Sequence, residues 1–280
     1  MPLVEKDYRR RFLMKKKILA AVLAASAVLM TACGSGSAEE KSSADHLQRI
    51  KDAGKITIGL EGDWQPFSYH DKDDRLVGYD VEVSKNIAKQ LGVKADIVEG
   101  PWDGLFAGMD SGRYDIVVNG VDVTPEREKK YDFSDPYAYD HTVLIVKRGN
   151  TDIRTFDDLK GKTTANSIGS TYQELGERYG ATVKGVDTLV ETLQMVKNGQ
   201  VDATINASTS FGDYMKSNPD DPLEVAATSE EATSYAIPME KGEDNKRLRS
   251  RINKTIQSMR DDGTLKKLSE KYFGADLTNK

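Results

Sequence analysis

The sequence has only one cysteine, Cys33, and three histidines among its 280 residues. A lone thiol excludes an internal disulfide and a cysteine metal cluster, and His46, His70 and His141 show no spacing that fits zinc. The chain also lacks a Gly-x-Ser-x-Gly nucleophile motif and a phosphate-binding loop. We therefore expect no catalytic residues, no metal and no cofactor.

No apolar run is long enough to span a bilayer as a helix, which takes about 20 residues. The longest small and apolar run, Ile18–Met30, follows three lysines, Lys15–Lys17, and leads to small residues before Cys33. This order predicts an export signal over residues 1–32. A buried helix is the alternative, but the polar stretch that starts at Gly34 gives such a helix nothing to pack against.

Basic residues are in the minority, with 40 Lys and Arg against 45 Asp and Glu. The first 32 residues hold seven basic and two acidic residues, so their removal changes the net charge from −5 to −10. An acidic body argues against nucleic acid as a partner. Residues 33–46 are small and polar and predict a flexible tether, and the 248 residues from Cys33 onward suffice for one large or two ordinary domains.

Short apolar strands alternate with amphipathic helices from Lys55 onward, in two successive runs separated near Lys147–Thr151. Strands are expected at "KITIGL", "VKADIVEG", "RYDIVVNG", "HTVLIVKR", "KTTANS", "TVKGV" and "VDATIN". Asp80 and Asp187 are expected to cap helices, and the chain closes with helices over Asn245–Asp262 and Leu265–Tyr272. This pattern predicts an α/β fold of two units, with a ligand site between them at the carboxyl ends of strands.

Three stretches carry a resemblance to a known family: "GLEGDWQPFSYHDKDDRLVGYDVEV", "PWDGLFAGMDSGRYDIVVNGVDVTPEREKKYDFSDPYAY" and "DGTLKKLSEKYFG". Together they resemble the polar amino-acid-binding proteins of bacterial ABC importers, solute-binding family 3, and most of all the cystine-binding branch. In addition, Met30-Thr31-Ala32-Cys33 resembles the lipobox of bacterial lipoproteins, in which the cysteine is acylated and becomes the mature N-terminus. Met30 departs from the usual leucine, and either Met1 or Met14 is the true start.

The resemblance implies a type II periplasmic-binding-protein-like fold of two α/β lobes joined by two hinge strands. Residues 47–145 and 240–280 would form the first lobe and residues 146–239 the second. The crossing strands would lie near Thr142–Lys147 and Tyr235–Met239.

The family pattern also implies which residues bind ligand. Arg127 would hold the ligand's α-carboxylate, whose two oxygens match a guanidinium fork, although its charged run also fits a solvated arginine. The N-terminus of a helix in the second lobe would bind the same carboxylate, or its serine and threonine would be ordinary helix caps. The remaining implied positions contribute backbone groups, aromatic walls or polar contacts. The implied ligand-binding set is Glu61, Trp64, Trp102, Gly120, Asp122, Arg127, Gly169, Ser170, Thr171 and Asn206.

Ala207 is the clearest departure from the family pattern, which has an aspartate there that pairs with the α-ammonium group. A bound ammonium without an anion would be costly. Either Glu61, Asp63 or Asp122 takes over this task, or the ligand lacks a standard α-amino-acid head. Asn206 or Ser208 would then contribute a neutral hydrogen bond.

We interpret the chain as the substrate-binding component of an amino-acid ABC importer, a monomer anchored by lipid on Cys33 at the extracytoplasmic face of the cell membrane. Its partners would be a small amino acid, cystine first among the candidates, and a permease with its ATPase. Two alternatives remain at this stage. One is an enzyme on the same fold resembling cyclohexadienyl dehydratases, and the other is an extracytoplasmic amino-acid sensor module.

Overall fold

The computed structural model describes residues 45–280, which fold into two α/β lobes. The predicted export signal, Cys33 and most of the predicted tether lie outside the described residues. The first lobe is built on a parallel sheet in the order β5 (Lys94–Glu99), β1 (Lys55–Leu60) and β6 (Ile116–Val117). β15 lies beside β6 and pairs antiparallel with β7.

The remaining elements of the first lobe surround this sheet. A small antiparallel sheet, β2-β3-β4, follows β1, and the last two helices return from the far end of the sequence. These elements are α2 (His46–Ala53), β2 (Asp63–Trp64), β3 (Ser68–His70), β4 (Leu76–Val77), α3 (Tyr79–Leu91), α4 (Trp102–Asp110), α5 (Pro125–Lys130), β7 (Tyr131–Phe133), β15 (Pro238–Glu240), η2 (Glu243–Asn245), α9 (Lys246–Asp261) and α10 (Thr264–Phe273).

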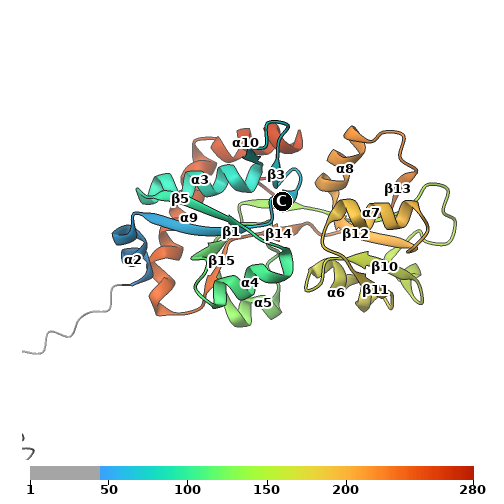
Figure 1. Cartoon of the computed structure of the whole chain (residues 1–280), viewed down its shortest axis with the longest axis horizontal. Coiled ribbons are helices and arrows are strands. Elements are labelled where there is room, and N and C mark those ends of the chain that lie inside the picture. Colours follow the sequence, from blue (N-terminus) through green and yellow to red (C-terminus); the bar gives the residue numbers. More distant parts are fainter. Residues whose placement is uncertain (1–44) are drawn as a thin grey trace, which may run out of the picture. The chain divides into compact units, whose positions relative to one another are not determined.

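Helical periodicity explains how the helices of the first lobe pack. Val83, Ile87 and Leu91 of α3 follow one another at the predicted four-residue spacing and are buried. α3 packs against α9 and α10, whereas α4 contacts β1, β6 and β15 (Figure 1). Asp80 does not cap α3 as expected: Gly78 is the N-cap, and Asp80 is fully buried in the first turn.

The second lobe has a five-stranded sheet in the order β11-β10-β12-β9-β13, in which β9 runs antiparallel to its neighbours. Helices cover both faces of this sheet (Figure 1). Its elements are β9 (Thr142–Lys147), η1 (Phe156–Leu159), β10 (Thr163–Asn166), α6 (Thr171–Arg178), β11 (Thr182–Gly185), α7 (Leu189–Lys197), β12 (Ala203–Ala207), α8 (Ser208–Ser217) and β13 (Leu223–Thr228).

The alternation of side chains along β9 divides the core of the second lobe in two. Val143 and Ile145 join the cluster of buried residues that includes residues of α7 and α8. Leu144 and Val146 join the cluster on the opposite face, with residues of η1 and α6. Because successive side chains of a strand point to opposite faces, a fully apolar strand is expected at the centre of such a sheet.

Two adjacent segments connect the lobes. β8 (Ala138–Asp140) pairs antiparallel with β14 (Thr233–Tyr235), and the chain then continues into β9 on one side and arrives from β13 on the other. β9 pairs along the second sheet, and β15 pairs with β7, so the structure places the crossing at residues 140–142 and 228–233 rather than within the strands expected to cross. The expected boundary at residue 145 falls inside β9.

Both ends of the described chain are tied down. Asp45 caps α2 by accepting a hydrogen bond from the Gln48 N–H at 3.0 Å, so the folded domain begins before the expected end of the tether at residue 46. At the other end, the Tyr139 N–H donates to the Leu277 carbonyl at 2.8 Å, which places the C-terminal residues against the connecting strand β8 (Figure 1). No helix within residues 45–280 has both the length and the apolar character that a membrane span requires.

Candidate functional site

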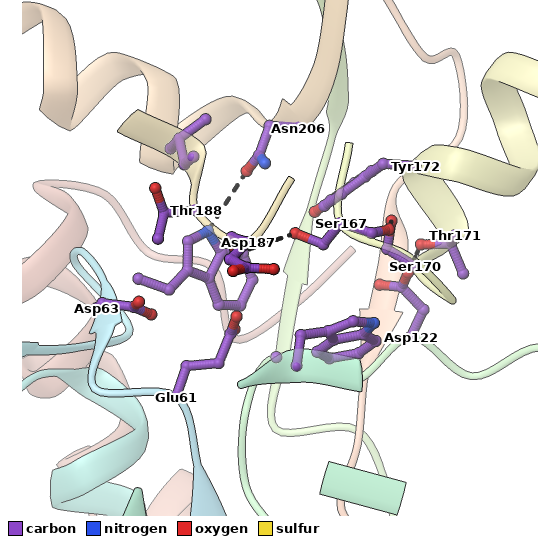
Figure 2. A pocket seen from close by; sticks show the side chains of 14 residues that line it. Glu61, Asp63, Asp122, Ser167, Ser170, Thr171, Tyr172, Asp187, Thr188 and Asn206 are labelled. Carbon is purple, nitrogen blue, oxygen red and sulfur yellow. Dashed lines mark hydrogen bonds between the residues drawn. The ribbon is translucent and has the colours of Figure 1, made fainter. Parts of the chain in front are cut away.

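A cavity lies between the two lobes, and both contribute to its walls (Figure 2). The space between its side chains, including the part open to solvent, is about 490 Å³. The first lobe contributes Glu61, Asp63, Trp64, Trp102, Gly120 and Asp122, and the second contributes Ser167, Ser170, Thr171, Tyr172, Asp187, Thr188, Leu189 and Asn206.

Glu61 stands directly after β1, at the carboxyl end of the strand, where ligand sites of α/β folds are expected. Asn119 fixes this residue twice: its amide donates to the Glu61 carboxylate at 2.6 Å, and its oxygen accepts from the Glu61 N–H at 2.8 Å. Burial raises the pKa of Glu61 to about 8 despite the hydrogen bond from Asn119. Glu61 is therefore held as a hydrogen-bonded carboxyl group that a cation would help to ionise.

Gly120 forms a floor on which Trp64 lies. Its φ is +50°, and a Cβ atom there would lie 2.6 Å from the Trp64 ring, so only glycine fits. The opposite support of Trp64 is Phe67, stacked with ring centroids 4.2 Å apart. The Gly120 N–H donates to the Tyr137 hydroxyl at 3.0 Å, and that hydroxyl donates to the buried Asp80 at 2.8 Å. A buried network thus sets the position of the cavity wall.

Arg127 does not line the cavity. Its guanidinium lies beside it, donating to the carbonyls of Asp122 and Gly169, each at 3.2 Å. It also stands 5.3 Å from the centroid of Trp102 and 5.2 Å from that of Phe106, which are cation–π distances. The Asp122 carboxylate is 3.9 Å from it. Arg127 is therefore already supplied with acceptors, and its contact with Gly169 links the two lobes.

Asp122 lines the cavity and joins the lobes as well. Its carboxylate accepts a hydrogen bond from the Thr171 hydroxyl of the second lobe. Burial raises the pKa of Asp122 to about 6, while the charge of Arg127 and the bond from Thr171 act in the opposite direction. The side chain is thus an anion at neutral pH and able to receive a cation from the cavity.

The mouth of α6 faces the cavity from the second lobe. Ser170 is the N-cap and accepts from the Gln173 N–H at 3.1 Å, as the sequence suggested for this position. Gly169 itself does not line the cavity, and its N–H is occupied by the side chain of Gln173 at 2.7 Å. Ser170 and Thr171 are therefore the residues of this predicted clasp that reach the cavity.

Asn206 reaches the cavity from the end of β12, and Ala207 does not. The Asn206 oxygen accepts from the indole N–H of Trp64 at 3.4 Å, which is a third contact between the lobes (Figure 2). Ala207 is fully buried as the N-cap of α8 and offers that helix no side-chain oxygen. Asp140 from β8 takes this place by accepting from the hydroxyls of Ser208 and Thr209, each at 2.6 Å.

The loop before α7 adds three residues that the sequence did not single out as ligand contacts, Asp187, Thr188 and Leu189. Asp187 was expected to cap this helix, but Thr188 is the N-cap and accepts from the Glu191 N–H. The Asp187 side chain is left to face the cavity (Figure 2). Tyr172 was also missed, although it directly follows the predicted helix N-terminus at Gly169–Thr171.

The chemistry of the lining favours binding. No histidine or cysteine is among the cavity residues, and residues 45–280 contain no group of three or more His, Cys, Asp or Glu placed to hold a metal. What the cavity offers is hydroxyl groups, an amide, two indole rings and four carboxyl groups. Such a lining can hold a small polar molecule by hydrogen bonds and charge.

Comparison with known proteins agrees with this geometry. Residues 56–275 match the profile of bacterial extracellular solute-binding proteins, family 3. The chain is 41% identical over 270 residues to the L-cystine-binding protein TcyA of Bacillus subtilis (strain 168), an alignment that covers 95% of this chain and all of TcyA.

Comparison with solved structures also indicates whether the two lobes are open or closed. An ancestral arginine-binding protein bound to arginine is 36% identical, with a TM-score of 0.73 over 79% of this chain and 99% of its own. The L-cystine solute receptor of Neisseria gonorrhoeae, in its unliganded open conformation, is 37% identical, with a TM-score of 0.56 over 84% of this chain and 99% of its own. At similar identity, the present arrangement of lobes is closer to the ligand-bound structure than to the open one.

Proposed function

The chain belongs to the bacterial extracellular solute-binding proteins, family 3, and we propose that it delivers a polar amino acid to an ABC importer while anchored to the membrane through Cys33. It is a binding protein rather than an enzyme, as are its named relatives. Cystine is a candidate ligand because TcyA is a cystine-binding protein, and arginine is another because a solved relative is bound to it.

The observation that carries this proposal is the cavity closed from both sides by direct contacts between the lobes. Arg127 donates to Gly169, Thr171 donates to Asp122, and Trp64 donates to Asn206. Each pair joins a residue of the first lobe to one of the second, so a small rotation at residues 140–142 and 228–233 would break all three. A ligand held by both walls would favour the closed arrangement by its differential affinity for it.

We assign the parts of an amino acid to the two walls as follows. The carboxylate would take the end formed by Ser170, Thr171 and the neighbouring guanidinium of Arg127, displacing the carbonyl of Gly169 from that guanidinium. The α-ammonium would pair with Asp122, because Ala207 has no charge to offer and is buried away from the cavity. The closed protein would then dock on the permease.

Binding of amino acids to the purified protein tests this proposal directly. A specific ligand stabilises the folded state by mass action, by about 2.7 kcal/mol when its concentration is 100 times its dissociation constant. The melting temperature rises as a result. We expect at least one amino acid in a panel that includes cystine and arginine to do so. If none of them changes the melting temperature or gives heat in calorimetry, the proposed function is wrong. A second measurement separates import from sensing. If the protein with bound ligand stimulates the ATPase activity of a permease–ATPase complex, its role is import.

The lipid anchor has its own test. Cys33→Ser removes the only thiol, so acylation there becomes impossible. Acyl chains add membrane affinity of about 0.8 kcal/mol per buried CH₂, and we therefore expect the variant to leave the membrane pellet and appear in the soluble extracytoplasmic fraction. Ser35→Ala, in the same predicted tether, is the matched control and should remain in the pellet. A Cys33→Ser protein that still pellets would contradict the anchor.

A further inference from the structure

One end of the cavity is surrounded by acidic side chains from both lobes. Glu61 and Asp63 reach it from the first lobe, and Asp187 reaches it from the second (Figure 2). We call these three residues the acidic end. Asp122 lies at the opposite end with Ser170 and Thr171 (Figure 2). Among the lining residues there is no lysine, arginine or histidine.

The acidic end has no counter-charge of its own. Of the four carboxyl groups of the lining, only Asp122 has a cation of the described protein within 4 Å, which is Arg127 at 3.9 Å. Burial is the main factor that raises the pKa of Asp63, and the charge of Asp187 across the cavity raises it further. Like charges that face each other across a closing interface oppose closure unless a cation lies between them.

The surroundings of the acidic end also suit a cation. The indole of Trp64 lines the cavity beside Asn206, and the face of an aromatic ring attracts a cation. Arg127 cannot neutralise this end, because its guanidinium is held by the Asp122 and Gly169 carbonyls and lies between Trp102 and Phe106.

We propose that the ligand is an amino acid with a basic side chain, whose distal cation lies between Glu61 and Asp63 of one lobe and Asp187 of the other. This inference rests on the proposed function and selects within it. Cystine fits the acidic end less well, because its second half would bring a carboxylate as well as an ammonium group to these three side chains. A lysine- or arginine-like side chain brings only the cation.

The same arrangement links ligand charge to closure. Glu61 and Asp63 belong to the first lobe, whereas Asp187 belongs to the second lobe and meets them only when the two lobes close on each other. A neutral ligand leaves the repulsion between Asp63 and Asp187 in place, and a cationic side chain converts it into attraction on both sides. The charge of the ligand thus decides how far the closed form is favoured.

Calorimetry with L-arginine and L-citrulline tests the proposal, because citrulline has nearly the same shape and a neutral end group. We expect arginine to bind at least tenfold more tightly than citrulline and than cystine. Asp187→Asn should reduce arginine affinity about tenfold and leave citrulline affinity unchanged. Glu191→Gln, which removes an equal charge one turn into α7 at an exposed position outside the cavity, should change neither.

The possible outcomes separate the two proposals. If citrulline or cystine binds as tightly as arginine, or if Asp187→Asn leaves the arginine-to-citrulline ratio unchanged, the basic-ligand inference is wrong while the proposed function stands. If no amino acid in the panel binds, the proposed function and this inference both fail. Asp187 is exposed in the loop before α7, so its substitution is not expected to impair folding.

Discussion

The two lobes have similar sheets but bury different kinds of polar group. Within the described chain, the first lobe and its connecting strand bury five acidic or basic side chains: His46, Asp80, Asp122, Arg127 and Asp140. The buried polar residues of the second lobe all carry hydroxyl or amide groups: Thr142, Thr164, Asn166, Ser170, Thr192, Thr204, Asn206 and Ser210.

This difference shows where the site is assembled. A buried ionisable group is tolerated only when it is hydrogen-bonded or paired, so each one fixes its neighbours in place. Asp80, Tyr137 and Gly120 form such a chain below the cavity, and Asn119 holds Glu61 at its side. The first lobe therefore carries a preformed half-site, and the second lobe supplies a cover of neutral groups plus the exposed Asp187.

The largest expected effect compares one side chain from each lobe. Arg127→Ala removes a buried guanidinium, leaves Asp122 without its cation and, under the proposed function, removes the partner of the ligand carboxylate. We expect it to weaken amino-acid binding by about 2–5 kcal/mol. Ser170→Ala removes the cap of α6 and one hydroxyl group at the carboxylate end, and we expect it to weaken amino-acid binding by only about 1 kcal/mol.

Calorimetry on both variants measures this difference. Arg178→Ala, an exposed arginine in the last turn of α6, is the control for loss of a positive charge and should bind normally. If Arg127→Ala and Ser170→Ala lost equal affinity, the first lobe would not carry a preformed half-site that differs from the contribution of the second lobe.

The next prediction compares the contributions that two buried hydroxyl groups, one in each lobe, make to the free energy of unfolding. Tyr137→Phe removes the hydroxyl that pairs with both the Gly120 N–H and an oxygen of Asp80, at about 1–3 kcal/mol for each, so we expect a loss of roughly 2–6 kcal/mol in the free energy of unfolding. Thr204→Val removes a hydroxyl that donates to the Ala165 carbonyl at 2.7 Å, and about 1–2 kcal/mol is expected. Urea unfolding of both variants measures these losses, and a greater loss for Thr204→Val would contradict the comparison.

The last comparison concerns the pH dependence of stability, which we assign to the first lobe. Burial raises the pKa of Asp80 to about 7, of Asp122 to about 6 and of Glu61 to about 8. In the unfolded chain these carboxyl groups have pKa values of about 4. At a pH between about 4 and their native pKa values, the native state therefore binds more protons than the unfolded state, and the free energy of unfolding falls as pH rises. Each of these groups lowers the free energy of unfolding by about 1.4 kcal/mol per pH unit up to its own native pKa, so we expect a decrease of several kcal/mol from pH 5 to pH 8 in the absence of ligand.

His46 acts in the same direction. Burial alone would lower its pKa, but hydrogen bonds to Asp115 at 2.7 Å and Asn245 at 2.5 Å, with the charge of Asp115, raise it. Its contribution is present below pH 6.5 and is lost as pH rises through the raised value. In the second lobe the shifted carboxyl groups, Asp158 and Asp221, have lowered pKa values and add nothing to this slope. The melting temperature of Glu61→Gln should fall less steeply with rising pH than that of the wild type. An unchanged pH dependence would exclude Glu61 as a source of it.

Much of the fold could be predicted from local pattern. The α/β class, the two-lobe architecture and the family are confirmed by the sheets and by the comparisons. Leu248, Ile252, Ile256 and Met259 of α9 are buried, as their four-residue spacing predicted. Such predictions succeed because a helix or strand buries one face at a fixed period, and that period depends only on near neighbours.

Local pattern did not determine which group would satisfy each polar side chain. Asp80 has the sequence context of a cap, yet its partner is the hydroxyl of Tyr137, 57 residues away. Asp187 likewise has the context of a cap, but the adjacent Thr188 takes that role. The missing oxygen at Ala207 is replaced by Asp140 from another strand, which no spacing in the sequence indicates.

The sequence by itself determined that two α/β units would form, that a ligand site would lie between them at the carboxyl ends of strands, and that Cys33 is the one residue available for a thiol-linked anchor. Only the tertiary structure decided that Arg127 lies beside the cavity, with its donors on backbone carbonyls, and that Asp187 faces Asp63. The reason is that periodicity is a local property, whereas the charge that a side chain meets depends on which distant segments fold against it.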